Sequence, residues 1–364
     1  MPPSPEPVRI AIDLGASSTR LGDACRPVPQ KVLPATALSY HHGAQQAGST
    51  LEPEAFEDIL AEVSNLAGDF QSPRPALLIS TPNAASASLR QDLAELALEK
   101  GVGSVALLPS AVAATIASGR SDSLVVDLGA GLTSVASVVR CELRKASLQE
   151  HPYAGNALDE QVLHALQHQV AWTCRVTGAH GGRDDDTTRK RQKLGGRLPF
   201  SALRLAQDLK ETVCFCAHVP LASLPPDEPY RHTLPDGQVI EVTSFSRQVP
   251  ETLLLGAPSL DAAAADPTPP FPGLPALVSE ALVGHEPSTS TSEVLLVGGS
   301  SRFVNFRDRL QAALTASGIT KVNVLPQRYA SWLGLSVAAS LGKPVVRYHT
   351  KAELEEFGKL RFTA

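Results

Sequence analysis

Apolar and polar residues alternate near the start of the chain, and this alternation predicts a strand. Val8, Ile10, Ile12 and Leu14 lie at a spacing of two, so they share one buried face of an extended segment. Similar apolar segments predict further strands at residues 77–80, 105–108, 124–128 and 135–139.

Between and beyond these strands the apolar spacing changes to that of a helix. Residues 89–101 carry apolar side chains on one helical face and end in a lysine and a glycine, which form a stop signal. In residues 292–318 an apolar strand runs into Gly298 and Gly299 and then into a second amphipathic helix. Alternating strands and helices predict an α/β fold with mixed or parallel sheets, whose ligands bind at the carboxyl ends of strands.

One short pattern occurs twice. IAIDLGASSTRLG at residues 10–22 and LVVDLGAGLTSVA at residues 124–136 each contain an apolar strand, an Asp-Leu-Gly turn, small residues and hydroxyl side chains. Glycine-rich turns bring backbone N–H groups close to phosphates, and carboxylates suit a magnesium ion that bridges them. The repeat therefore predicts that Asp13 and Asp127 face each other across a nucleotide, and Gly298-Gly299 allows a flat ligand to approach a third turn.

Composition narrows the class of protein. The chain has 364 residues, is 43% hydrophobic and has a net charge of -5, which is enough for two cored domains and gives no reason to expect adsorption to nucleic acid or membranes. The N-terminal residues MPPSPEP lack the basic flank and apolar run of a secretory leader, and no segment approaches a membrane span. Five cysteines without a CxxC pair favour a reducing compartment.

Two stretches have the composition of insertions. Residues 178–196 are polar and contain the basic cluster Arg189, Lys190, Arg191 and Lys193, which we interpret as a solvated loop or as a nuclear-import signal. Residues 261–275 are rich in alanine and proline and are not expected to hold a regular element.

Three other features have structural explanations. His164 and His168 share a helix face, yet no third ligand accompanies them, so we expect a solvated or partly packed pair rather than a metal site. Cys214 and Cys216 are expected to be packed thiols, and Trp332 to lie in the core.

Several separate segments together resemble actin and the actin-related proteins. The two Asp-Leu-Gly turns resemble the family's two phosphate loops, and Gly298-Gly299 resembles its adenosine loop. The remaining matches are Lys210-Glu211 in DLKETVCF, TLPDGQVIEV at 233–242, RQVPETLL at 247–254 and QRYASWLGLSVAASL at 327–341.

The resemblance implies an α/β fold of the actin-like ATPase type, with duplicated ribonuclease H-like domains in two lobes around a nucleotide cleft. Domain I would comprise residues 1–118 and 325–364, and domain II residues 119–324 with the insertions near 178–196 and 261–275. ATP or ADP with Mg²⁺ would be the ligand, and Asp13 and Asp127 would face the metal ion.

Further ligand contacts are implied residue by residue. Arg20 stands where the family has a phosphate-contacting lysine. The residues implied to contact phosphates, ribose or base are Gly15, Ala16, Ser17, Arg20, Gly129, Ala130, Gly131, Leu132, Gly155, Lys210, Glu211, Gly298, Gly299, Phe303 and Arg328. A protein that kept these turns only for its fold would be the alternative.

The chain departs from the family where the attacking water is oriented. A glutamine and a histidine hold that water in the family, and gapless counting places Ser110 and Ala146 at their positions. Ala130 replaces the acidic residue of the second phosphate turn. We therefore expect ATP hydrolysis to be very slow or absent, and no catalytic residue is assigned.

A second departure lies between Arg26 and Ser49. The family has a whole small lobe here, with a loop that docks into the next subunit of a filament, and most of it is missing. Because a head-to-tail contact needs two complementary surfaces, we expect weak filament formation.

Two classes of function remain open. One is an ATP-binding scaffold subunit of a cytoskeletal or nuclear complex, in cytoplasm or nucleus, with protein partners such as actin or other actin-related proteins and no nucleic acid or membrane contact. The other is a working enzyme, either a polymerising actin-like ATPase or a sugar kinase. A sugar kinase would need a carboxylate base near a substrate cleft, and the sequence offers none beyond the pair predicted to face the metal.

Overall fold

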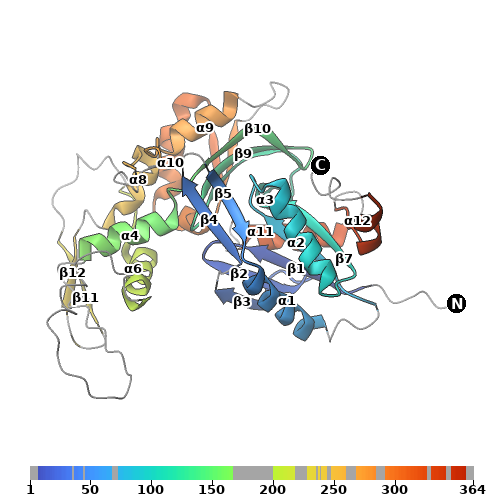
Figure 1. Ribbon diagram of the computed structural model, residues 1–364. Helices are drawn as coiled ribbons and strands as arrows, with labels where there is room; N and C mark the ends of the chain where they lie inside the picture. The colour runs from blue at the N-terminus through green and yellow to red at the C-terminus, as the bar shows by residue number, and fades with distance from the viewer. Residues whose placement is uncertain are drawn as a thin grey trace, which may run out of the picture. The chain divides into compact units, whose positions relative to one another are not determined.

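The structure is a computed structural model (Figure 1). It describes residues 7–34, 37–43, 46–67, 73–166, 200–217, 228–234, 237, 239–243, 247–259, 268–283, 292–325, 329–341 and 346–357. The predicted insertion at 178–196, residues 261–267 of the predicted insertion at 261–275, His168 and Arg328 lie outside these residues. The chain divides into two compact units: Met1–Gly155, Thr252–Arg302 and Phe306–Ala364 form the first, and Asn156–Glu251 with Phe303–Asn305 form the second.

The first unit contains a five-stranded mixed sheet in the order β3-β2-β1-β6-β7. Strand β2 pairs antiparallel with β1 and β3, whereas β6 pairs parallel with β1 and β7. The strands are β1 (Arg9–Leu14), β2 (Ser18–Asp23), β3 (Lys31–Pro34), β6 (Ala76–Thr81) and β7 (Ser104–Pro109).

A second five-stranded sheet of the same unit repeats this arrangement in the order β10-β9-β8-β13-β14. Strand β9 pairs antiparallel with β8 and β10, and β13 pairs parallel with β8 and β14. The strands are β8 (Ser123–Leu128), β9 (Thr133–Val139), β10 (Glu142–His151), β13 (Glu293–Val297) and β14 (Lys321–Val324). The sequence repeat is thus a repeat of structure, because each copy forms the antiparallel hairpin at the centre of one sheet.

Helices cover both faces of these sheets. Helices α1 (Pro53–Ala67) and α2 (Ala87–Glu99) pack on the face of the first sheet that carries Ile10 and Ile12. Helices α3 (Ser110–Ala117) and α11 (Ala330–Leu341) pack on the opposite face, with Ala11, and also contact the second sheet. Trp332 of α11 is fully buried there, as predicted.

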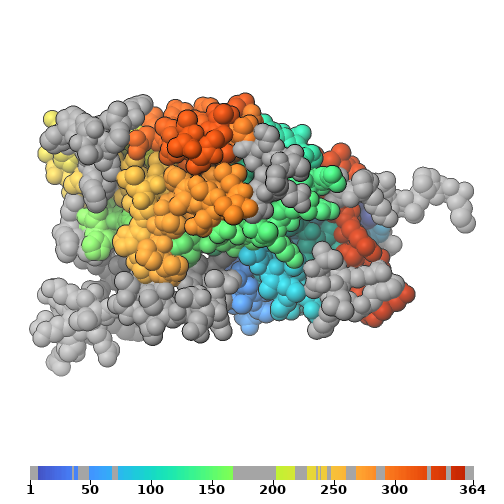
Figure 2. Space-filling view, turned by 90° about the horizontal axis from the view of Figure 1, so that it is seen from above, coloured from blue at the N-terminus to red at the C-terminus, as the bar shows by residue number. Residues whose placement is uncertain are grey.

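The outer side of the second sheet carries α9 (Leu274–Val283) and α10 (Phe306–Leu314). The view in Figure 2 shows the orange atoms of this region at the molecular surface. Shorter elements of the first unit are α8 (Thr252–Leu255), α12 (Lys351–Phe357), η3 (Gly299–Arg302) and η4 (Thr315–Ser317).

The short segment between β2 and α1 forms β3 and a separate hairpin of β4 (Leu38–Gly43) and β5 (Gln46–Leu51). The predicted shortening of this region therefore leaves an edge strand and one hairpin. Within the described residues no helix is long and apolar enough to cross a membrane.

The second unit is smaller. Its described elements are α4 (Gly155–Leu166), whose first residue still belongs to the first unit, α6 (Phe200–Val213), β11 (Tyr230–Thr233), β12 (Val239–Val242) and η2 (Val249–Glu251). Cys214 and Cys216 are buried in it, which confirms their reading as packed thiols, and burial raises the pKa of Cys214 to about 12. The predicted domain boundaries remain a prediction.

Candidate functional site

Asp13 is the penultimate residue of strand β1, and the strand register places a polar residue on each side of it. Its neighbour on β2 is Arg20, and its neighbour on β6 is Ser80. Arg20 Nη1 lies 2.7 Å from Asp13 Oδ2, and Ser80 Oγ donates a hydrogen bond of 2.7 Å to Asp13 Oδ1. Both carboxylate oxygens of this buried aspartate therefore have a partner from the protein.

The guanidinium of Arg20 makes two further contacts. Its Nη2 donates to Ser18 Oγ at 3.0 Å, and its Cζ lies 5.0 Å from the centroid of the Tyr329 ring. The buried Nε atom has no hydrogen-bond partner among the described residues. Three neighbours thus hold a partly exposed cation at the first turn.

Both predicted phosphate turns need glycine for steric reasons. A Cβ on Gly15 would lie 2.8 Å from Ser18 O, and one on Gly129 would lie 2.9 Å from Leu132 O. The N–H of Gly129 donates to Leu132 O at 3.1 Å, so this group closes its own turn. The two turns have the same construction, in agreement with the sequence repeat.

Asp127 holds in β8 the place that Asp13 holds in β1, and the turn after β13 lies against it. Gly298 has a φ of +91°, and a Cβ there would lie 2.3 Å from Leu128 O and 2.7 Å from Asp127 Oδ1. The pKa of Asp127 is raised to about 6, mainly by burial and also by the charge of Asp13, while Arg20 opposes the rise. The adenosine-loop glycine and the second aspartate are therefore neighbours.

The start of α4 completes this cluster. The N–H of Gly155 donates to Gly129 O at 3.0 Å, and a Cβ on Gly155 would lie 3.2 Å from Ala130 Cα and from Ser300 Oγ. Gly299 has open space around its Cα, since a Cβ there would meet nothing within 4 Å. The first unit therefore brings together the predicted site residues Asp13, Gly15, Ala16, Ser17, Arg20, Asp127, Gly129, Ala130, Gly131, Leu132, Gly155, Gly298 and Gly299.

Three of the other predicted contacts, Lys210, Glu211 and Phe303, belong to the second unit. Lys210 is buried, and its Nζ lies 2.7 Å from Asp159 Oδ1. Burial raises the pKa of Asp159, and Lys210 opposes this. Glu211 is exposed and accepts a hydrogen bond from Gln207 on the same helix, while Phe303 is half-buried. Lys210 thus forms an ion pair with Asp159, a residue of its own unit.

Four polar residues near the first unit's turns were not singled out from the sequence. One is Ser80, the partner of Asp13. Asn83 Oδ1 accepts hydrogen bonds from Ser110 Oγ at 3.2 Å and from Ala111 N at 2.9 Å. Asn83 Nδ2 donates to Ser134 Oγ at 2.9 Å, so one amide joins the start of α3 to β9. The spacing of residues in the sequence does not predict these contacts, because they depend on strand register.

The structure places Ser134, rather than Ala146, beside Asp127. Ser134 is the β9 partner of Asp127 across the strand pair. Ala146 is exposed and lies where the register of β10 shifts between Arg144 and Gln149. The assignment of Ala146 to the family's histidine position remains a prediction.

Glu150 is the fourth residue. It pairs with Ser134 from the β10 side, and its Oε1 accepts a hydrogen bond of 3.2 Å from Ala84 N. Burial raises the pKa of Glu150 to about 7; the Ala84 N–H opposes the rise and Asp127 adds to it. A carboxyl group that titrates near neutral pH thus lies two strands away from Asp127.

The predicted magnesium pair can be tested against these contacts. Each oxygen of Asp13 accepts one contact from the protein, one of them from a cation, and keeps a second lone pair. Asp127 has no cation as a strand neighbour. Carboxylate oxygens suit a hydrated Mg²⁺ ion, and the assignment of Asp13 and Asp127 to such an ion remains a prediction.

Comparison with known proteins identifies the family. The model of the Actin family matches residues 34–362. The chain belongs to the actin family. This match and the two mixed sheets confirm the predicted actin-like α/β fold. The first turn, with Asp13 and Arg20, precedes the matched range.

Individual relatives of this actin-family chain are distant. It is 30% identical over 311 residues to "Actin-related protein 4" of Oryza sativa subsp. indica, covering 78% of this chain and 69% of the relative. The corresponding protein of Arabidopsis thaliana is 26% identical over 321 residues, with the same coverage. "Actin-like protein 7B" of Homo sapiens is 24% identical over 326 residues, covering 86% of this chain and 70% of the relative. The chain is thus a divergent actin-related protein.

Proposed function

We propose that this actin-family protein is a nucleotide-binding scaffold subunit that hydrolyses ATP very slowly or not at all. The observation that carries the proposal is the chain of hydrogen bonds from Ser110 through Asn83 to Ser134. These side chains satisfy one another next to the second turn. Because Asn83 engages the hydroxyl groups of Ser110 and Ser134, these groups would not hold an attacking water.

Binding of ATP or ADP would use the turns of the first unit. Backbone N–H groups of the two glycine-rich turns would suit phosphate oxygens, and the open space at Gly299 would leave room for a flat ligand. Lys210, Glu211, Phe303 and Arg328 remain predicted contacts to ribose or base, and Mg²⁺ remains a predicted companion of the nucleotide. Without water-orienting groups the hydrolysis rate would fall by about 10²- to 10⁴-fold.

An active ATPase is the second candidate, and one observation favours it. Glu150 pairs with Ser134, the strand neighbour of Asp127, and burial raises the pKa of its carboxyl group to about 7, so this group could accept a proton from a water molecule at neutral pH. In that case Glu150→Gln would lower turnover without lowering nucleotide affinity.

The test combines nucleotide content with turnover. The purified protein is denatured, released nucleotide is quantified by chromatography, and phosphate release from added ATP is followed in parallel with Glu150→Gln. One equivalent of bound nucleotide with no measurable phosphate release supports the scaffold. Sustained phosphate release that Glu150→Gln removes would instead establish the ATPase.

Partners and location follow from the family by analogy. Several relatives are actin-related or actin-like by name, and a protein without its own turnover would act through its surface. We propose a multisubunit protein assembly, cytoskeletal or nuclear, that includes actin or another actin-related protein. Affinity isolation with identification of the bound proteins, together with imaging of the tagged chain, tests this.

A further inference from the structure

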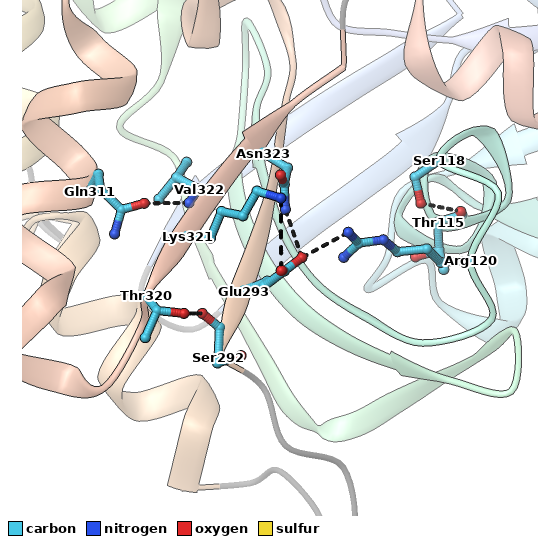
Figure 3. A network of polar contacts seen from close by, with 10 residues as sticks. All are labelled: Thr115, Ser118, Arg120, Ser292, Glu293, Gln311, Thr320, Lys321, Val322 and Asn323. Atoms are coloured by element: carbon cyan, nitrogen blue, oxygen red, sulfur yellow. Dashed lines mark hydrogen bonds and ion pairs between the residues drawn. The ribbon is translucent and has the colours of Figure 1, made fainter.

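Around Glu293 of strand β13 the protein surface satisfies its own polar groups (Figure 3). Arg120 and Asn323 donate hydrogen bonds of 2.8 and 3.0 Å to Glu293 Oε2, and both contacts lower the pKa of this carboxyl group. Because these charges are already paired, a partner protein would gain little by contacting them. Residues 268–275, which lead into helix α9, differ from this surface, because they expose several prolines and contain no charged residue.

Residues 268–272 have the sequence Thr-Pro-Pro-Phe-Pro, and we call them the proline strip. Each of these residues is a proline or precedes one. Proline fixes its own φ, and the residue before a proline is held in the extended or polyproline II region. Phe271 confirms the extended backbone, since it exchanges two hydrogen bonds of 2.8 and 2.9 Å with Ala257. The strip is therefore restricted to the backbone of a polyproline II helix, which has three residues per turn.

Burial along the proline strip follows this period of three. Thr268 and Phe271 are three residues apart, and each is only 2% exposed. Pro269, Pro270 and Pro272 are exposed. A helix with three residues per turn has three edges. One edge of the strip thus lies against the protein, and the prolines on the other two edges face solvent.

Aromatic side chains at the end of β10 hold the buried edge. The ring of Phe271 stacks on Tyr153 with centroids 5.0 Å apart and lies 4.9 Å from the ring of His151. His151 Nε2 lies 3.1 Å from the carbonyl oxygen of Pro269. A Cβ on Gly256 would lie 2.6 Å from Phe271 O, so glycine is needed for this close approach. The strip is thus fixed before a partner binds, which lowers the entropic cost of binding.

We propose that the proline strip is a docking site for a partner protein with an aromatic-lined groove that binds polyproline II segments. Grooves of this kind take segments with two prolines three residues apart, and Pro269 and Pro272 have this spacing. Aromatic rings of the groove would pack on the exposed proline rings. This inference specifies one kind of partner for the proposed assembly, and it does not depend on nucleotide binding.

Charge distinguishes between kinds of groove. Residues 268–275 contain no lysine, arginine, aspartate or glutamate. An SH3 domain adds an acidic pocket for a basic residue of its ligand, and on this strip the carboxylates of that pocket would stay unpaired. A WW domain has an uncharged groove of tyrosine and tryptophan rings. The uncharged strip therefore fits a WW domain better than an SH3 domain.

The test is titration calorimetry of the full-length protein with a panel of purified WW domains that bind Pro-Pro-x-Pro ligands, with SH3 domains for comparison. We expect binding to a WW domain that a free proline-rich peptide displaces and that is lost when the groove tryptophan is replaced by alanine. Absence of binding to every WW domain, or binding to SH3 domains alone, would overturn the inference. Either result would leave the proposed function standing, because nucleotide content and phosphate release are measured separately.

Variants of the strip make the test specific. We expect Pro269→Ala and Pro272→Ala each to weaken binding about tenfold, because each removes two methylene groups from the contact with the groove. Both prolines are exposed, so we expect the circular dichroism spectrum to stay unchanged. The matched control is Pro27→Ala, an exposed proline between β2 and β3, which should bind as the wild type does. Wild-type affinity in both strip variants would contradict the proposal.

Discussion

Strand register determines which residues lie next to each aspartate of the candidate site. Asp13 and Asp127 occupy matching positions in the repeat, but Asp13 lies between Arg20 and Ser80, whereas Asp127 lies between Ser134 and Val297. The first aspartate is therefore neutralised by an ion pair, and the second has no cation as a strand neighbour. The duplication supplies two similar turns with different electrostatics.

Gly298 should be intolerant of any side chain. Its φ of +91° is strained for other residues, and a Cβ would meet Leu128 O at 2.3 Å. We expect Gly298→Ala to lower the free energy of unfolding by about 2 kcal/mol or more, measured by urea denaturation. The control is Gly299→Ala, where a Cβ meets nothing within 4 Å and the change should be within about 0.5 kcal/mol. Equal effects of the two substitutions would contradict this explanation.

Glu150 should make stability depend on pH. Its pKa in the folded protein, about 7, exceeds the ordinary value of 4.5, so folding favours the protonated form. The stability from this group is fully present below pH 4.5 and is lost as the pH rises through about 7. Glutamine cannot ionise. We therefore expect the unfolding free energy of Glu150→Gln, relative to wild type, to increase between pH 5 and about pH 8.

Urea denaturation of both proteins at several pH values in this range measures the difference. Glu142→Gln is the matched control, because Glu142 is exposed at the other end of the same strand. A difference between Glu150→Gln and wild type that stays constant with pH would show that Glu150 is ionised in the folded protein throughout.

The sequence predicted the site residues that local backbone geometry requires, and it missed those that only strand register brings together. Asp13, Asp127 and Gly298 stand in turns whose residue types require a particular backbone, and that requirement is visible in the chain itself. Asn83 and Ser134 matter only because strand pairing and a hydrogen bond bring them together. Contacts set by register cannot be read from one strand alone.

At the scale of elements, helices α3 and α11 join the two sheets at a very close crossing. A Cβ on Gly334 of α11 would lie 1.8 Å from Ala113 O of α3, so the helices can approach this closely only with glycine. We expect Gly334→Ala to destabilise the protein by about 3 kcal/mol, despite the better helix propensity of alanine. Thermal unfolding followed by circular dichroism measures the loss.

Ser340→Ala on the same helix is the control for this prediction. Ser340 is exposed and its hydroxyl donates only to Ser336 O within the helix, so its loss should change stability by less than about 0.5 kcal/mol. If Gly334→Ala were as stable as this control, the close crossing would not be a feature of the protein in solution.

Helices and strands could be predicted from the sequence where apolar residues recur at a regular spacing. The strand predicted at 77–80 is Ala76–Thr81, and the helix predicted at 89–101 is Ala87–Glu99. The order of strands was not predictable to the same degree, because it requires pairing between segments more than a hundred residues apart, such as β8 with β13.

On the scale of the whole molecule, the repeated Asp-Leu-Gly pattern indicates the fold because the structure itself is duplicated. Each copy forms a hairpin at the centre of a five-stranded sheet, and both sheets share the core around α3 and α11. The family match adds what periodicity could not, namely that this duplicated architecture is that of actin.

The short segment between β2 and α1 leads to a prediction about filament formation. Between β2 and α1 the chain has room only for β3 and the β4–β5 hairpin, where the family resemblance implies a lobe that docks into the next subunit. A helical filament needs two complementary surfaces on every subunit, and loss of one leaves contacts that cannot propagate. We therefore expect the protein to stay in the supernatant after high-speed centrifugation at high concentration in Mg²⁺ and ATP, with filament-forming actin as the positive control. Abundant filaments in the pellet, seen by electron microscopy, would mean that the remaining hairpin suffices for docking and that the short segment is not what limits assembly.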